Sequence, residues 1–149
     1  MIISRRHFAH TLSALAYSGL GRQARLEDPA SLVWSLENIS WAPDDPPGAK
    51  YAVLDGDRDR AGELFSYAFW LPGNVWAPVH RHSQTAHVAV LKGTLQLGFG
   101  PTADRRRTVR VPAGQFFIVR AGQLHYEGSD DECLIVGTAM GGWTTTVVG

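Results

Sequence analysis

The sequence lacks the features of several large functional classes. Its one cysteine, Cys133, stands in an apolar stretch and has no partner for an intrachain disulfide, so cysteine usage leaves the cellular compartment open. Fourteen Lys and Arg residues balance fourteen Asp and Glu residues, so no net charge draws the chain to nucleic acid or to an anionic membrane. No phosphate-binding loop and no nucleophile–base motif is present. The composition therefore gives no sign of a nucleic-acid or phosphate-binding function.

The N-terminal residues have the pattern of an export signal. Arg5 and Arg6 precede Phe8 in a motif that resembles the twin-arginine signal, and residues 8–21 form a short apolar stretch after them. That stretch is too short to cross a bilayer unaided, and no other segment is apolar for long enough, so we expect no stable membrane insertion. We predict a signal peptide over residues 1–26 and a periplasmic protein. The alternative is an N-terminal helix on a cytoplasmic protein.

Residues 31–149 have the pattern of one all-β domain. Sixteen Gly and eight Pro separate short runs of β-branched and aromatic residues. Phe65, Tyr67 and Phe69 alternate along one face of a strand, and Lys92-Gly93 is a two-residue hairpin turn. Strands are expected at residues 31–38, 50–54, 64–71, 79–82, 86–91, 94–99, 108–111, 115–119, 132–138 and 143–148, with a proline-rich loop at 42–48. Nine or ten short strands at regular spacing predict a closed β-barrel or jelly roll.

Three of the six histidines have the spacing of metal ligands. His80 and His82 are two residues apart, so both rings point to the same face of a strand. Two neutral imidazoles placed in this way can bind one ion at roughly 2.0–2.1 Å. His125 lies in a later segment, three residues after Gly122. An HxH pair alone is weak evidence for a metal site, because two histidines can simply line a polar face of the barrel.

The glycines around these histidines resemble the two sequence motifs of the cupin superfamily. The matching residues are Gly73, His80, His82 and Gly93 in the first motif and Gly114, Gly122 and His125 in the second. One extra residue separates Gly73 from His80, and Arg120 stands where the family usually has proline. The resemblance covers residues 41–148 and is closest to small single-domain bacterial cupins. It implies a cupin jelly-roll β-barrel with His80, His82 and His125 as metal ligands.

One ligand of the family pattern is missing. The family's glutamate position, six residues before Gly93, holds Ala86, which cannot bind a metal. Alternation along the strand points Ala86 inward and His87 outward. A bulge at residues 83–85 would reverse this and make His87 a ligand. Gln84 is a second polar alternative, so the expected protein ligands are the three histidines, with His87 and Gln84 as alternatives.

Three neutral imidazoles leave the double charge of an ion uncompensated and leave coordination positions open. Such a set suits Fe(II) and, less selectively, Mn, Ni, Zn or Cu. Cupin thiol and diketone-cleaving dioxygenases share it, so the resemblance implies a mononuclear metal-dependent oxygenase acting on a small organic substrate. The alternative is a non-catalytic cupin that binds or senses a small ligand, even without metal.

Further residues are expected near the substrate pocket: Trp76, Ala86, Arg120 and Tyr126. Glu127 is a candidate general acid or base through its nearness to His125 in sequence alone, and no catalytic residue is assigned. The many aromatic strand residues need cover on the outside of the barrel, and small cupins usually pair through edge strands. We therefore predict a homodimer.

Overall fold

The computed structural model describes residues 32–148. The predicted signal peptide, residues 1–26, lies outside the described residues, so export stays a prediction, as does the homodimer. Among the described residues, no helix is long and apolar enough to span a bilayer. The strands are β1 (Ala42–Asp44), β2 (Ala49–Asp55), β3 (Leu64–Leu71), β4 (Val75–Trp76), β5 (His80–His82), β6 (Ala86–Lys92), β7 (Thr94–Phe99), β8 (Val109–Pro112), β9 (Phe116–Val119), β10 (His125–Ser129), β11 (Cys133–Met140) and β12 (Thr145–Val147).

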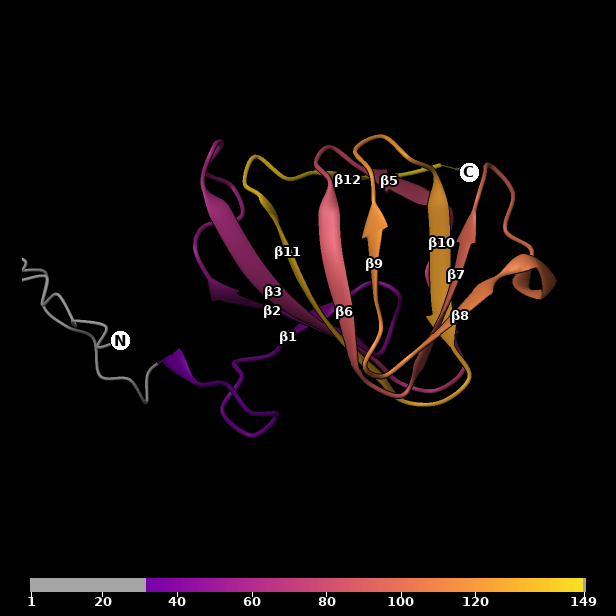
Figure 1. The fold of residues 1–149 in the computed structure, drawn as a ribbon, viewed down its shortest axis with the longest axis horizontal. Helices are drawn as coiled ribbons and strands as arrows, with labels where there is room; N and C mark the ends of the chain where they lie inside the picture. Colours follow the sequence, from indigo (N-terminus) through magenta and orange to yellow (C-terminus); the bar gives the residue numbers. More distant parts are fainter. Residues whose placement is uncertain (1–31, 149) are drawn as a thin grey trace, which may run out of the picture. The chain divides into compact units, whose positions relative to one another are not determined.

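These strands form two antiparallel sheets (Figure 1). One sheet has the order β1-β2-β3-β11-β6-β9, and the other has the order β12-β5-β10-β7-β8, with β4 paired to β10. Strands that are distant in sequence are neighbours in both sheets, as β3 and β11 are in the first and β5 and β10 are in the second. This arrangement is that of a jelly roll, and it confirms the predicted all-β fold class.

The core lies between the two sheets. Phe65, Val88 and Ile135 from the first sheet pack in one buried cluster with Leu95 and Leu97 from the second. Each of these residues is separated by two from another buried residue on its strand, which is the period that places side chains on one face. The apolar alternation in the sequence therefore fixes which face of each strand is buried.

The structure corrects two predicted elements. Residues 32–38 form no strand, because a turn closes there through hydrogen bonds from the Asn38 and Ile39 amides to the Ser35 carbonyl. The Ser35 amide also donates to the Asn38 side chain, at 2.6 Å, an alternative to a strand ladder. The predicted loop at residues 42–48 begins instead with β1, an edge strand on which Pro43 is tolerated. The arginine run at residues 105–107 is an exposed single-turn 3₁₀ helix, η2.

The predicted hairpin at Lys92-Gly93 is wrong, because β6 and β7 do not pair: the tight turn between them passes the chain from the first sheet to the second, and it requires glycine. Gly93 has φ of +74°, and a Cβ atom there would lie 2.1 Å from the carbonyl oxygen of Glu132. The left-handed backbone conformation and the close approach of the Glu132 carbonyl both exclude a side chain at this position. The turn directly follows β6, the strand that carries Ala86 and His87 and whose register is set by its pairing with β9 and β11.

Candidate metal centre

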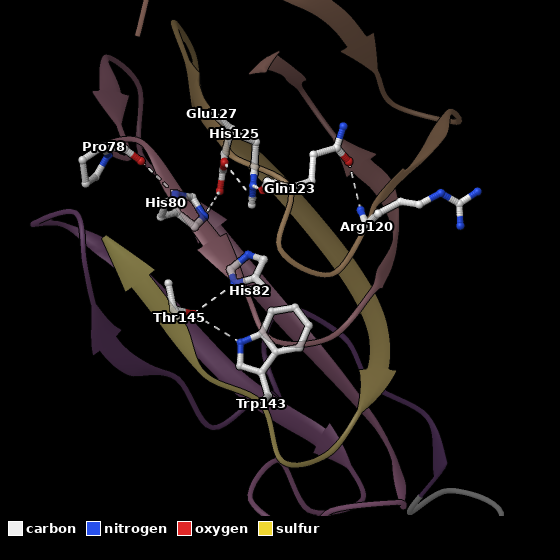
Figure 2. Close-up of polar contacts among 9 residues, drawn as sticks. All are labelled: Pro78, His80, His82, Arg120, Gln123, His125, Glu127, Trp143 and Thr145. Atoms are coloured by element: carbon white, nitrogen blue, oxygen red, sulfur yellow. Dashed lines mark hydrogen bonds and ion pairs between the residues drawn. The ribbon is translucent and has the colours of Figure 1, made fainter. Parts of the chain in front are cut away.

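Strand pairing brings the three histidines together. β5 carries His80 and His82, with Arg81 between them exposed on the opposite face. His80 pairs directly with His125 across β5 and β10, and His82 pairs with Thr145 across β5 and β12. Because paired residues in adjacent strands point to the same face, the rings converge on one side of the sheet. Figure 2 shows this convergence.

The three rings are close enough to share one ion. Ring centroids are 4.1 Å apart for His80 and His125, 4.8 Å for His80 and His82, and 4.9 Å for His82 and His125. One ring nitrogen from each lies within 4.8 Å of the others. His80 and His125 are 5% and 2% exposed, so the cluster is largely withdrawn from water.

Backbone carbonyls set the orientation of two of these rings. His80 Nδ1 lies 2.8 Å from the Pro78 carbonyl oxygen, and His125 Nδ1 lies 2.9 Å from the Gln123 carbonyl oxygen. A carbonyl oxygen can only accept, so each Nδ1 carries a proton and donates it. In a neutral ring the lone pair then resides on Nε2, which is the nitrogen that faces the cluster.

Glu127 adds a carboxylate to the cluster. It lies two residues after His125 on β10 and so shares its face. Its Oε1 is 3.7 Å from His80 Nε2, and its Oε2 is 3.7 Å from His125 Nε2. These separations are too long for hydrogen bonds. The Glu127 Oε2 atom is buried and has no hydrogen-bond partner among the described residues. In the sequence, only its nearness to His125 pointed to Glu127, although a period of two along a strand from His125 places it on the same face.

Burial keeps two of the rings in the form that binds metal. Burial first, and then the neighbouring His125 and His80 rings and Arg58, lower the pKa of His82 to about 3. Burial also lowers the pKa of His125, against the opposing effect of the Glu127 carboxylate. Metal ligation needs a deprotonated Nε2, so neutral imidazoles at these positions favour a cation between them.

The cluster opens onto a cavity of about 640 Å³. His80, His82 and Glu127 form part of its lining. Much of the remaining lining is aromatic, from Tyr51, Tyr67, Phe69, Trp76 and Trp143. A mostly apolar cavity of this size with a few convergent polar groups is typical of a small-molecule site.

The two alternative ligands lie elsewhere. Ala86 is fully buried while His87 is exposed, so the predicted alternation along β6 is confirmed without a bulge that inverts it. His87 and Gln84 line a separate depression together with Thr85 and Thr138. Neither belongs to the histidine cluster that could hold an ion.

Of the residues expected at the substrate pocket, Trp76 lines the cavity. Ala86 is fully buried in the apolar core and does not line the cavity. Tyr126 points to the opposite face of β10 from His125, where its hydroxyl donates to the Asp104 carbonyl at 2.9 Å. The side chain of Arg120 is exposed and extends away from the histidines (Figure 2).

Thr145 orients the third ring, that of His82, through its hydroxyl group. Its Oγ1 lies 3.0 Å from His82 Nδ1 and accepts a hydrogen bond from Trp143 Nε1 at 3.3 Å. When Nε2 of His82 faces an ion, Nδ1 carries the proton and donates it to this hydroxyl oxygen. The Trp143 ring also packs on the His82 ring, with centroids 4.2 Å apart.

Replacing Thr145 with valine should weaken metal binding about tenfold, because the isosteric side chain cannot accept from His82 and a lost ligand-orienting group typically has this effect. Isothermal titration calorimetry with Zn²⁺ measures the change. Thr146→Val, the neighbouring exposed position on β12, is the matched control and should bind Zn²⁺ like the wild type. Equal affinities for both variants would contradict the role of Thr145.

Comparisons with known proteins identify the fold. No family model matches the chain. Germin-like protein 5-1 from Oryza sativa subsp. japonica is 34% identical over 86 residues, which cover 57% of this chain and 38% of that protein. The chain thus spans well under half the length of this curated relative.

Two solved structures have the same architecture. An RmlC-like cupin from Shewanella frigidimarina NCIMB 400 matches with a TM-score of 0.57 at 17% identity, over 72% of this chain and 87% of the other. The polyketide cyclase RemF from Streptomyces resistomycificus matches with a TM-score of 0.59 at 22% identity, over 72% of this chain and 78% of the other. Likeness at these identities shows the fold, and proteins of different function share it.

Proposed function

We propose that this chain, which has the cupin fold, is a metal-dependent enzyme of the cupin superfamily. One divalent transition metal ion binds to His80, His82 and His125, with the Glu127 carboxylate beside them. The centre acts as a mononuclear oxygenase on a small organic molecule held in the adjoining cavity. Fe(II) is the favoured metal on the chemistry of the ligands, since imidazole and carboxylate donors with open positions suit it.

The observation that carries the proposal is a convergence of electron-rich atoms that have no donor between them. The Nε2 atoms of His80 and His125 face the two oxygens of Glu127 at 3.7 Å, while carbonyl acceptors hold the protons of both rings at Nδ1. Lone pairs that face each other in a buried space repel unless a proton or a cation lies among them. Burial lowers the pKa of His125, which disfavours the extra proton. A metal ion satisfies the three rings and the carboxylate together.

Glu127 also supplies negative charge that a site of three neutral histidines lacks. Three neutral imidazoles leave a dication uncompensated, and the side chain of Glu127, 13% exposed, is close enough to offset part of that charge. Glu127 on β10 therefore supplies the carboxylate that the family pattern supplies from the motif position held here by Ala86. The donors are nitrogen and oxygen atoms, and among the described residues no thiolate joins them.

The rest of the site suits a reaction on a bound organic molecule. Three histidines and one carboxylate leave positions open on the ion, and the cavity lies next to His80 and His82. The metal would supply activation of molecular oxygen next to a substrate held at the same centre. The protein's own residues hold the three rings rigidly, exclude bulk water through the aromatic lining, and confine the substrate beside them.

The metal content of the purified protein tests the proposal. Protein prepared without added metal, then reconstituted anaerobically with Fe(II), should hold one equivalent of iron by mass spectrometric metal analysis. The iron protein should also form an EPR-active adduct with nitric oxide, an analogue of oxygen, because open positions are required for it. Stoichiometric iron without the nitrosyl adduct would overturn the oxygenase. A protein that takes up no transition metal would favour the metal-free ligand-binding cupin.

A further inference from the structure

Arg58 is fixed at the edge of the cavity by its backbone. It lies in the loop between β2 and β3, and its carbonyl oxygen accepts from the amides of Gly142 and Trp143, at 2.9 and 3.2 Å. A Cβ atom on Gly141 would lie 2.2 Å from the Arg60 carbonyl oxygen, so this loop packs tightly on the segment before β12. That segment carries Trp143 and leads into Thr145, the first residue of β12, and both residues contact His82. The backbone of Arg58 is thus fixed relative to the residues that contact His82.

The guanidinium of Arg58 faces the cavity without a carboxylate partner. Among the described lining residues it is the one Lys or Arg, and no described carboxylate lies within the 4.0 Å of an ion pair. Its Cζ lies 5.3 Å from the centre of the Tyr51 ring. Burial raises the pKa of the Tyr51 hydroxyl, and the charge and hydrogen bond of Arg58 partly offset the rise. The contact with Tyr51 positions the guanidinium, and no ion pair with a described residue occupies its remaining N–H donors.

The acidic residues of the lining do not neutralise Arg58. Asp44 and Asp45 are both exposed, at the end of β1 and just after it. Glu127 lies on β10 between His80 and His125 and is engaged with the candidate metal centre. Asp44 and Asp59 lie near enough to act on the pKa of the Tyr51 hydroxyl together with Arg58, yet no described carboxylate pairs with the guanidinium, so Arg58 stays available to an anion.

An aromatic wall runs from Arg58 toward the histidines. The Tyr51 and Tyr67 rings stack with centroids 5.6 Å apart, the Tyr67 and Trp143 rings are 6.1 Å apart, and Trp143 packs on His82. Burial raises the pKa of Tyr67 above its ordinary value, so its phenol keeps its proton and can donate. The Tyr51 and Tyr67 planes differ by 24° and the Tyr67 and Trp143 planes by 50°, and aromatic surfaces of this kind pack against conjugated rings in offset or edge-on contacts.

We propose that the cavity binds aromatic carboxylates, with the carboxylate on Arg58 and the ring along the wall formed by Tyr51, Tyr67 and Trp143. This assignment names the substrate class of the proposed oxygenase and rests on it for the reaction, while the preference for a carboxylate in the binding step depends on Arg58 and not on a metal. The planar guanidinium matches a carboxylate in a two-point hydrogen bond. The far end of the ring system then lies beside His82.

The experiment compares 2-naphthoate with its uncharged amide, 2-naphthamide, by isothermal titration calorimetry on metal-free and Zn²⁺-loaded protein. The wild type should bind 2-naphthoate at least about tenfold more tightly than the amide in both forms, as expected for a charge-assisted pair. Arg58→Gln should bind the two probes equally, and Arg58→Lys should keep part of the preference. Arg60→Gln is the matched control. It removes a cation from the same loop, but the Arg60 side chain is exposed and paired with Glu63 at 3.0 Å.

Comparing metal-free with Zn²⁺-loaded protein distinguishes ligand binding by Arg58 from the proposed metal-dependent function. A preference for 2-naphthoate that depends on Arg58 in metal-free protein supports the ligand class even if no metal binds. A preference seen only in Zn²⁺-loaded protein and unchanged in Arg58→Gln would show that the metal holds the carboxylate, which overturns the role of Arg58. Failure of the wild type to bind 2-naphthoate, or equal binding of acid and amide, would overturn the assignment as well.

Discussion

Replacing His82 with alanine should abolish stoichiometric metal binding, with the affinity for Zn²⁺ or Fe(II) falling by about 100-fold or more. Apparent free energies of about 10–16 kcal/mol for four-ligand sites imply about 3 kcal/mol for each ligand, or a little over two decades of affinity. His82 is the best of the three to test, because it is half-buried, whereas His80 and His125 are buried and pack in the interior. Metal analysis after gel filtration and calorimetric titration measure the loss.

His87→Ala is the control for this variant. His87 is exposed on β6 and stands on the opposite face from the buried Ala86, so its loss should leave metal content and affinity unchanged. Thermal melting of the metal-free proteins should show that both variants are folded. Loss of metal in His87→Ala with retention in His82→Ala would mean that the ion binds at the depression lined by His87 and Gln84, and would refute the three-histidine centre.

Local signals in the sequence predicted most strands. The alternation of Phe65, Tyr67 and Phe69 predicted a strand at 64–71, where β3 lies, because large apolar residues at a period of two need one buried face. The turn at Gly93 was equally local, but the hairpin predicted there was wrong, because β6 and β7 pair with other strands in different sheets. The strand predicted at residues 31–38 was wrong, since the side-chain and backbone bonds between Ser35 and Asn38 close a turn that apolar content alone does not reveal.

The candidate site was predictable only in part, since it depends on long-range pairing. The period of two placed His80 and His82 on one face, but only the pairing of β5 with β10 brings in His125 from more than forty residues away. Spacing along the chain carries no information about that register, so the family resemblance supplied the third ligand. Arg58 and Trp143 meet through backbone hydrogen bonds between two loops, for which the sequence offers no pattern.

The expected absence of a carboxylate shows what a motif misses. The motif counts residues within one segment, and at its glutamate position it finds Ala86, which the structure places in the apolar core. The same chemistry can reach the same space from another strand. Glu127 does so from β10, with an oxygen 3.7 Å from the Nε2 atom of His80 and another 3.7 Å from that of His125. Applying the period of two onward from His125 would have predicted this placement.

Glu127→Gln should therefore change metal affinity and stability in opposite directions. The amide has the shape of the carboxylate but no charge, so affinity for a divalent ion should fall by about tenfold to 100-fold, in the range seen when groups that support a metal ligand set are removed. The metal-free protein should become more stable by about 1–3 kcal/mol, because a buried carboxylate oxygen without a partner is lost. Calorimetric titration with Zn²⁺ and thermal melting, both at pH 8 with and without metal, measure the two effects.

Glu132→Gln is the matched control, because this exposed carboxylate accepts from Trp70 Nε1 at 2.7 Å and pairs with Lys92 at 3.0 Å, outside the histidine cluster. It should lower stability slightly and leave metal affinity unchanged, since an exposed pair contributes about 1 kcal/mol or less. A purely structural role for Glu127 predicts the reverse of our expectation: a less stable metal-free protein that binds Zn²⁺ like the wild type. The sign of the change in metal-free stability therefore decides whether Glu127 is held in place for the fold or kept, at a cost to the fold, for the ion.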